Sequence, residues 1–188
     1  MAWFLCRHGE TLLNRQKIVQ GRCNSLLTLK GIDQIKSIAY RILDHESDFS
    51  NYKLISSPII RTRQTMQIIQ EILGITDKKV IEDELITETD TGDYTYLSWN
   101  YIKEKFPDFN SDRHFQYPNG ENKQDVYARI AKFYEKIKDE ENLIVVSHGN
   151  VSRQLAYIRN GLPQQEAATE RFNQNYFYIS NKDGFKQI

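Results

Sequence analysis

The chain has 188 residues and no net charge at neutral pH, because 25 lysines and arginines balance 25 aspartates and glutamates. This balance argues against non-specific binding to nucleic acid or to an anionic membrane, and the length suits one domain with a sizeable core. With 39% hydrophobic residues, two cysteines and no apolar run of membrane-spanning length, the composition argues against a disulfide scaffold and an integral membrane protein. We expect a soluble, cytoplasmic protein.

The first predicted element is a strand at residues 2–5, which runs directly into the sequence CRHGET. A β-prone run that stops at Arg-His-Gly is typical of a strand followed by a tight turn, and Gly9 allows the backbone to approach a ligand closely. Arg7 and His8 therefore stand at the carboxyl end of a strand, where open α/β sheets bind their ligands. Cys6 is predicted to be a small apolar core residue.

A helix is predicted next, with Thr28 as its N-cap and apolar residues at three- and four-residue spacing behind it. Gly31 near its start lowers the helix propensity, and no local feature of the sequence explains it. The run 53–57 then predicts a second strand, and the helical pattern of 59–73 carries Arg61 in its first turn.

Residues 79–81 are a short strand candidate, and from 82 to 120 the pattern loosens into acidic turns, a short helix and an aromatic-rich loop. Because loops at strand ends usually carry specificity, we interpret 82–120 as an insertion that covers the site within a single domain of residues 1–188. Its aromatic residues either form a pocket wall or pack a small subdomain: Tyr94, Tyr96, Trp99, Tyr101, Phe109, Phe115 and Tyr117.

The last third of the chain returns to regular periodicity. It predicts a helix over 122–138, a buried strand over 143–146, a helix that ends at 161–163, and a closing pair of strands at 176–179 and 184–185. The buried strand runs into the sequence SHGN, so His148 stands at a strand end as His8 does.

Polar side chains thus follow three predicted strands. If these strands are parallel neighbours, their carboxyl ends bring two arginines and two histidines to one rim of the sheet. These residues are Arg7, His8, Arg61 and His148. Two guanidinium groups and two imidazoles together suit the binding of a phosphate.

In chain order the sequence carries RHGET from Arg7, then Asn14, QG from Gln20, SSP from Ser56 with Arg61 behind it, and VSHG from Val146. These blocks resemble the histidine phosphatase family, also called phosphoglycerate-mutase-like, over nearly the whole chain. The resemblance implies phosphoryl transfer through a phosphohistidine. The fold we expect is a three-layer α/β/α sandwich with a mainly parallel central sheet.

His8 is the predicted nucleophile, because an imidazole has a free lone pair near neutral pH and a phosphohistidine divides one transfer into two easier steps. His148 is predicted to donate a hydrogen bond to the transferring group, whose charge fixed cations and donors must hold. The predicted substrate-binding residues are Arg7, Asn14, Gln20, Gly21, Arg61 and Gly149. Arg63 is predicted to lie on the surface, because a helical turn aims it elsewhere.

A leaving alkoxide needs a proton, so we expect a carboxylic acid near the rim. The resemblance implies an acid four residues before a glycine, and Glu88 with Gly92 fits that spacing. The residues from Asp93 onward depart from the usual family pattern, so Glu84 and a surface role for Glu88 remain alternatives. The further candidates are Glu10, Asp90 and Asp93.

Three other charged residues have two interpretations each. Glu121 either contacts the substrate or complements a helix dipole, and Arg22 and Arg153 either bind a second anionic group or are solvated, as isolated arginines usually are. The four histidines lack the spacing of metal ligands, and arginines already supply positive charge, so the sequence predicts no metal and no cofactor.

The sequence therefore predicts a metal-independent phosphatase acting on small-molecule phosphomonoesters. A phosphoglycerate mutase would use the same pocket, but relatives of that type typically have a larger insertion and a C-terminal tail, whereas this chain ends at Ile188 close behind its last predicted strand. A non-catalytic, phosphate-binding regulatory module is the third alternative. An exposed aromatic cluster would permit a homodimer.

Overall fold

The structure is a computed structural model that describes residues 2–107, 115–161, 174, 177–181 and 184–187. Within these ranges the strands form one six-stranded sheet in the order β3-β2-β4-β1-β5-β6. The strands are β1 (Ala2–Arg7), β2 (Lys53–Ser56), β3 (Val80–Glu82), β4 (Asn142–Ser147), β5 (Phe177–Asn181) and β6 (Gly184–Gln187). The pairs β3–β2, β2–β4 and β4–β1 are parallel, whereas β5 is antiparallel to both of its neighbours, β1 and β6. This confirms a mainly parallel sheet.

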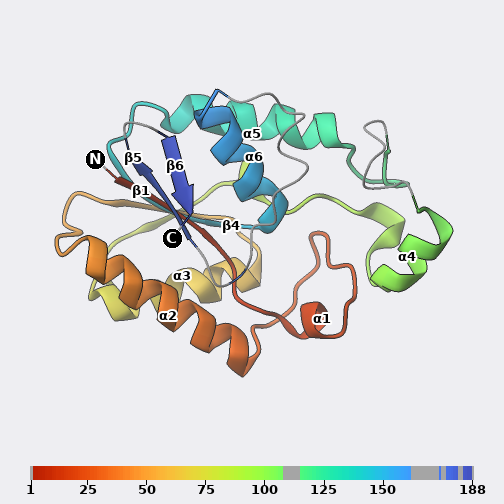
Figure 1. Ribbon diagram of the computed structural model, residues 1–188, viewed down its shortest axis with the longest axis horizontal. Coiled ribbons are helices and arrows are strands. Elements are labelled where there is room, and N and C mark those ends of the chain that lie inside the picture. The colour runs from red at the N-terminus through yellow and green to blue at the C-terminus, as the bar shows by residue number, and fades with distance from the viewer. Residues whose placement is uncertain (1, 108–114, 162–173, 175–176, 182–183, 188) are drawn as a thin grey trace.

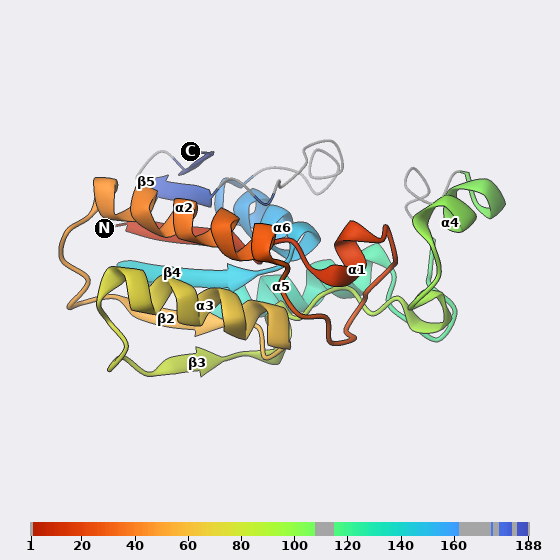
Figure 2. The ribbon, with the colours of Figure 1, turned by 90° about the horizontal axis from the view of Figure 1, so that it is seen from below.

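Helices cover both faces of the sheet (Figures 1 and 2). One face carries α2 (Leu29–His45) and α3 (Ile60–Leu73), and the other carries α5 (Lys123–Ile137) and α6 (Gly149–Arg159). The short elements are α1 (Leu12–Arg15), α4 (Trp99–Lys105) and the 3₁₀ turns η1 (Glu84–Ile86) and η2 (Gly92–Tyr94). The predicted three-layer α/β/α sandwich is confirmed. No helix in the described ranges is long and apolar enough to span a membrane.

Alternate residues of β1 face the two helical layers. Phe4 and Cys6 are buried in the core beneath α2 and α3, whereas Trp3 and Leu5 are buried beneath α5 and α6. This confirms Cys6 as a core residue, and burial raises the pKa of its thiol to about 12. A sheet covered on both faces requires such continuous apolar strands.

The predicted helices agree with the observed ones except at their ends, where caps decide the boundary. Thr28 caps α2 as predicted, because its hydroxyl accepts a hydrogen bond of 3.0 Å from the Gly31 N–H. The helix after β4 begins at Gly149 and ends at Arg159, before the predicted end at 161–163. Residues 162, 163 and 176, at predicted element ends, lie outside the described ranges.

The segment after β3 extends beyond the carboxyl ends of the strands and carries α4 at its far end (Figure 2). Hydrogen bonds of 2.9 Å join it to the loop after α1, from Val19 N–H to Leu97 O and from Tyr96 N–H to Val19 O. Tyr94 and Ile102 pack with Val19 in a small core of their own. The two segments therefore form one wall beside the strand ends.

Candidate active site

Three parallel strand ends meet at one edge of the sheet, because β4 lies between β1 and β2. The register pairs Arg7 of β1 with Ser147 of β4, so His8 and His148 follow neighbouring strand ends. Their ring centroids are 5.3 Å apart. Arg61 reaches the same edge from the first turn of α3, and it lines one cavity there with Arg7 and His8. His148 is buried beside His8 and is not among the described residues that line this cavity.

His8 is almost completely buried, with 1% of its surface exposed. Its Nδ1 lies 2.8 Å from the carbonyl oxygen of Gly9, and because a carbonyl oxygen only accepts, Nδ1 carries the proton. Burial, followed by the positive charges of Arg61 and Arg7, lowers the pKa of His8 well below its usual value. The ring is therefore neutral near pH 7, and its lone pair is on Nε2.

His148 is completely buried, with Nε2 at 2.9 Å from Ser57 Oγ and Nδ1 at 4.0 Å from Glu88 Oε2. Burial, followed by the charge of Arg61, lowers its pKa well below the usual value, so this ring is also neutral. A neutral ring carries one N–H, and a lone pair on Nδ1 would face the Glu88 carboxylate. The tautomer with Nδ1–H is therefore favoured, and Ser57 donates its hydroxyl proton to Nε2.

Arg61 is 1% exposed beneath the loop after α1. Its Nη1 and Nη2 donate hydrogen bonds to the carbonyl oxygens of Cys23 and Gly21, both at 2.8 Å, and its buried Nε has no partner among the described residues. These bonds orient the guanidinium and leave N–H groups for an anion in the cavity. Arg63 pairs with Glu82 on the surface, as predicted.

Arg7 packs against the start of α6. A side chain on Gly149 would stand 3.1 Å from the Arg7 Nε and Cζ atoms, so a glycine there leaves room for the guanidinium. Gly149 is not among the described residues that line the cavity. Burial lowers the pKa of Arg7 against the opposing effect of Glu88, yet an arginine remains charged at any working pH.

Asn14 and Gln20 line the cavity with amides whose oxygens are already occupied. Asn14 Oδ1 accepts hydrogen bonds from Thr11 N–H at 3.3 Å and from Gln174 Nε2 at 2.9 Å, and Gln20 Oε1 accepts one from the Thr11 hydroxyl at 2.9 Å. Their NH₂ groups therefore remain as donors for an anion. Gly21 completes this stretch at a positive φ of 48°.

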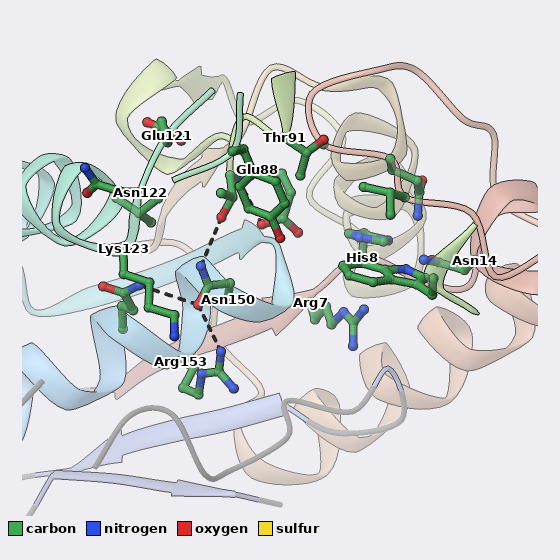
Figure 3. Close-up of a pocket in the computed structure, with 18 of the residues that line it drawn as sticks. Arg7, His8, Asn14, Glu88, Thr91, Glu121, Asn122, Lys123, Asn150 and Arg153 are labelled. Atoms are coloured by element: carbon green, nitrogen blue, oxygen red, sulfur yellow. Dashed lines mark hydrogen bonds between the residues drawn. The ribbon is translucent and has the colours of Figure 1, made fainter. Parts of the chain in front are cut away.

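These side chains enclose a cavity of about 330 Å³ at the strand ends. Figure 3 shows Arg7, His8 and Asn14 on one side of it and residues 121–123 on the other, with Glu88 between them. Buried cations, amide donors and a neutral imidazole therefore share one enclosure with the Glu88 carboxyl group near its centre and Glu121 on its far side, which suits the binding of an anion and a proton transfer to it.

A family model described as the histidine phosphatase superfamily, branch 1, matches residues 3–180. The chain belongs to this superfamily. This confirms the resemblance seen in the sequence, and it implies a phosphorylated small molecule as the ligand of the cavity.

Similar proteins of known name include mutases and phosphatases. The 2,3-bisphosphoglycerate-dependent phosphoglycerate mutase of Methylorubrum populi is 25% identical over 175 residues, which are 88% of this chain and 82% of the mutase. Human 6-phosphofructo-2-kinase/fructose-2,6-bisphosphatase 4 is 29% identical over 86% of this chain and 34% of its own length. The solved alpha-ribazole phosphatase of Shigella flexneri shares the fold, with a TM-score of 0.82 at 22% identity over 100% of this chain and 95% of that one.

The candidate carboxylates of this superfamily member differ in their position relative to the cavity. Glu88 lines the cavity and faces His148, whereas Glu84 in η1 is not among the described lining residues. Glu10 and Asp90 are engaged in ion pairs with exposed cations, and Asp93 accepts a hydrogen bond at the surface. The geometry therefore favours Glu88 as the acid over the other candidates.

The far side of the cavity holds three polar residues that the sequence did not single out, Lys123, Asn150 and Gln154. Arg153, for which the sequence left both anion binding and solvation open, lines the same side. Arg153 is half-buried and its Nη2 donates a hydrogen bond of 2.9 Å to Asn150 Oδ1, so it is not an isolated surface arginine. The signal was the spacing of three and four residues from Asn150, which places these side chains on one face of α6.

The aromatic residues of the insertion divide between two positions. Trp99, Phe115 and Tyr117 line the cavity, whereas Tyr96 and Tyr101 are exposed. Tyr94 is buried in the small core, and Phe109 lies outside the described residues. Both interpretations, a pocket wall and a packed subdomain, therefore apply to different members of the set.

Proposed function

We propose that this histidine phosphatase hydrolyses phosphomonoesters of small molecules through a phosphohistidine at His8 and without a metal. The observation that carries the proposal is the hydrogen bond between His8 Nδ1 and Gly9 O, which leaves the lone pair on Nε2 of a neutral, buried ring beside Arg7 and Arg61. Residues 82–120 act in this proposal as the insertion that covers the site.

In the first step the lone pair on His8 Nε2 attacks phosphorus and the bond from phosphorus to the ester oxygen breaks. Glu88 gives its carboxyl proton to that leaving oxygen, which departs as an alcohol. The two arginines hold the charge on the remaining phosphoryl oxygens, and His148 donates its Nδ1–H to one of them. Asn14 and Gln20 add amide donors.

In the second step a water molecule attacks the phosphohistidine. Glu88, now a carboxylate, accepts a proton from the water, the bond between phosphorus and Nε2 breaks, and its electron pair returns to His8. Inorganic phosphate leaves and the acid is regenerated. The arginines supply the positive charge that a metal would otherwise bring, and a phosphoryl-transfer site needs such charge from one source or the other.

We prefer a phosphatase to a mutase because the aligned stretch covers 82% of the mutase, which therefore has further chain outside the stretch that the two proteins share. A mutase must also keep water from its phosphoenzyme. A difference in length does not measure activity, so the test includes phosphoglycerate isomerisation.

The test is phosphate release in EDTA from a panel of aryl, sugar, nucleotide and glycerate phosphates. We expect native protein to turn over at least one of them, and His8→Ala to lose at least about a thousandfold in kcat, because no other nucleophile replaces the ring. His45→Ala is the matched control, since this histidine is the last residue of α2, away from the cavity lining.

Mass spectrometry of rapidly quenched enzyme should show a phosphoryl group on His8. Release that is equal in native protein and His8→Ala would contradict the mechanism. Isomerisation of phosphoglycerate without net release would establish the mutase, and phosphate binding without either reaction would establish a binding module.

A further inference from the structure

Glu88 lies in an irregular segment between η1 and η2, so no helix or strand fixes its backbone. A buried arginine of α5 does so instead. Arg129 is 11% exposed at its side chain; its Nη1 donates hydrogen bonds to Leu85 O at 2.7 Å and Thr87 O at 2.8 Å, and its Nη2 donates to Glu88 O at 3.2 Å. One guanidinium therefore binds the carbonyl of the candidate acid and two carbonyls just before it.

Glu121 holds this guanidinium from the other side. Arg129 Nε donates to Glu121 Oε1 at 2.8 Å and Nη2 donates to Oε2 at 3.0 Å. Burial would raise the pKa of Glu121, but hydrogen bonds from Arg129 and the Asp90 N–H outweigh it and hold the pKa below its usual value. The carboxylate is charged, and it binds both Arg129 and the backbone on the far side of Glu88.

All five N–H groups of the Arg129 guanidinium are used in these bonds. A lysine has three donors on one atom and cannot bind three carbonyls and a carboxylate in this planar arrangement. The other charged group on this backbone is Arg22, whose exposed side chain donates to Glu88 O at 3.3 Å and to Glu121. Asn150 holds the neighbouring Thr89 hydroxyl at 3.0 Å.

We propose that Arg129, locked by Glu121, is a positioning residue that fixes the backbone of Glu88 for proton transfer to the leaving oxygen. The proposal rests on the proposed function. A catalytic group misplaced by about 1 Å can cost about a hundredfold in rate, and proton transfer is sensitive to this distance. The expected consequence is a defect confined to substrates whose leaving group needs a proton.

The experiment compares kcat/KM for an alkyl phosphate, whose leaving group needs protonation, with that for dinitrophenyl phosphate, whose leaving group does not. Because kcat/KM reports steps up to formation of the phosphohistidine, the later use of Glu88 as a base does not interfere. The variants are Arg129→Lys, Glu121→Gln and Glu88→Gln, with Arg63→Lys as the surface control. Competitive inhibition by inorganic phosphate checks that the anion site is intact.

We expect Glu88→Gln to lose about a hundredfold or more on the alkyl ester and less than about threefold on the dinitrophenyl ester. Arg129→Lys and Glu121→Gln should show the same selectivity at about tenfold to a hundredfold, with phosphate inhibition unchanged. Arg63→Lys should match native protein on both esters.

Equal losses on both esters in Arg129→Lys would overturn the proposal and assign the residue to folding alone. The proposed function would still stand in that case if Glu88→Gln lost more activity on the alkyl ester than on the dinitrophenyl ester. No selectivity in Glu88→Gln would also overturn the proposal for Arg129, because there would be no acid to position. Activity that survives His8→Ala would instead overturn the proposed function itself.

Discussion

At the scale of single residues, the site depends on which nitrogen of each histidine carries its proton. The Gly9 carbonyl fixes the tautomer of His8, and the Ser57 hydroxyl fixes that of His148. Ser57 is completely buried, and its oxygen also lies 3.4 Å from the Ile59 N–H, so its proton is available for the ring. Ser57 therefore controls whether the N–H of His148 is on Nδ1, the nitrogen that faces Glu88.

We predict that Ser57→Ala lowers kcat/KM by about fivefold to tenfold, since one net hydrogen bond of about 1 kcal/mol is lost and the tautomer of His148 is no longer fixed. Nitrogen NMR of the ring should show mixed tautomers. Ser56→Ala is the matched control, because within the described residues that buried hydroxyl donates its hydrogen bond to the Ser57 carbonyl and not to His148. A pure Nδ1–H tautomer in Ser57→Ala would contradict the assignment.

At the scale of elements, the turn after β1 is pressed against the first turn of α2. Glu10 O accepts from Thr28 N–H at 2.9 Å, and Glu10 N–H donates to Gln34 Oε1 at 2.9 Å. A side chain on Gly31 would collide with Glu10 O, and one on Gly9 would collide with Gly31 O. The glycine that weakens the helix locally is thus what lets the helix support the turn that follows His8.

We predict that Gly31→Ala destabilises the protein by about 1–3 kcal/mol, although the same change in an open helix would be stabilising. Urea unfolding measures it, and kcat/KM should fall because the turn moves. Ser37→Ala, on the exposed face of the same helix, should change the free energy of unfolding by less than about 0.5 kcal/mol. A more stable Gly31→Ala protein would show that the two backbones can separate without cost.

At the scale of the whole molecule, a chain without net charge concentrates buried cations at one end of its sheet and keeps two neutral histidines among them. Burial and Arg61 lower the pKa of His8 and His148 well below the value of about 6.5 in an unfolded chain. Below that pH the unfolded state takes up protons that the folded state does not. The free energy of unfolding therefore falls as pH decreases from about 6.5 toward the folded pKa values.

We predict a slope of up to about 1.4 kcal/mol per pH unit for each histidine between about pH 5 and 6.5. Urea unfolding across this range should show it in native protein, and His8→Asn/His148→Asn should lose most of it. Above pH 7 the two proteins should have equal slopes. An unchanged slope in the double variant would mean that these rings titrate normally in the folded state.

Sequence alone was enough for features set by near neighbours along the chain. Buried strands, amphipathic helices and their caps follow from periodicity and local hydrogen bonding, so the sheet and its helices could be predicted to within a residue or two. Arg61 could be separated from Arg63 by its motif, and strand ends carrying His8 and His148 could be placed at one rim because parallel strands share an edge.

Only the tertiary structure decided features that depend on distances between remote segments. The sequence favours Glu88 over Glu84 only through its spacing to Gly92, and it takes the structure to show that Glu88 lines the cavity. Gly31 likewise has no explanation until Glu10 O is found against it. Arg129 lies three residues after the buried Val126, so it is near the core-facing side of α5, where a charge needs partners. Those partners are 8 to 44 residues away along the chain. Hydrogen bonds and packing across such separations are set by the meeting of whole elements, which no local pattern encodes.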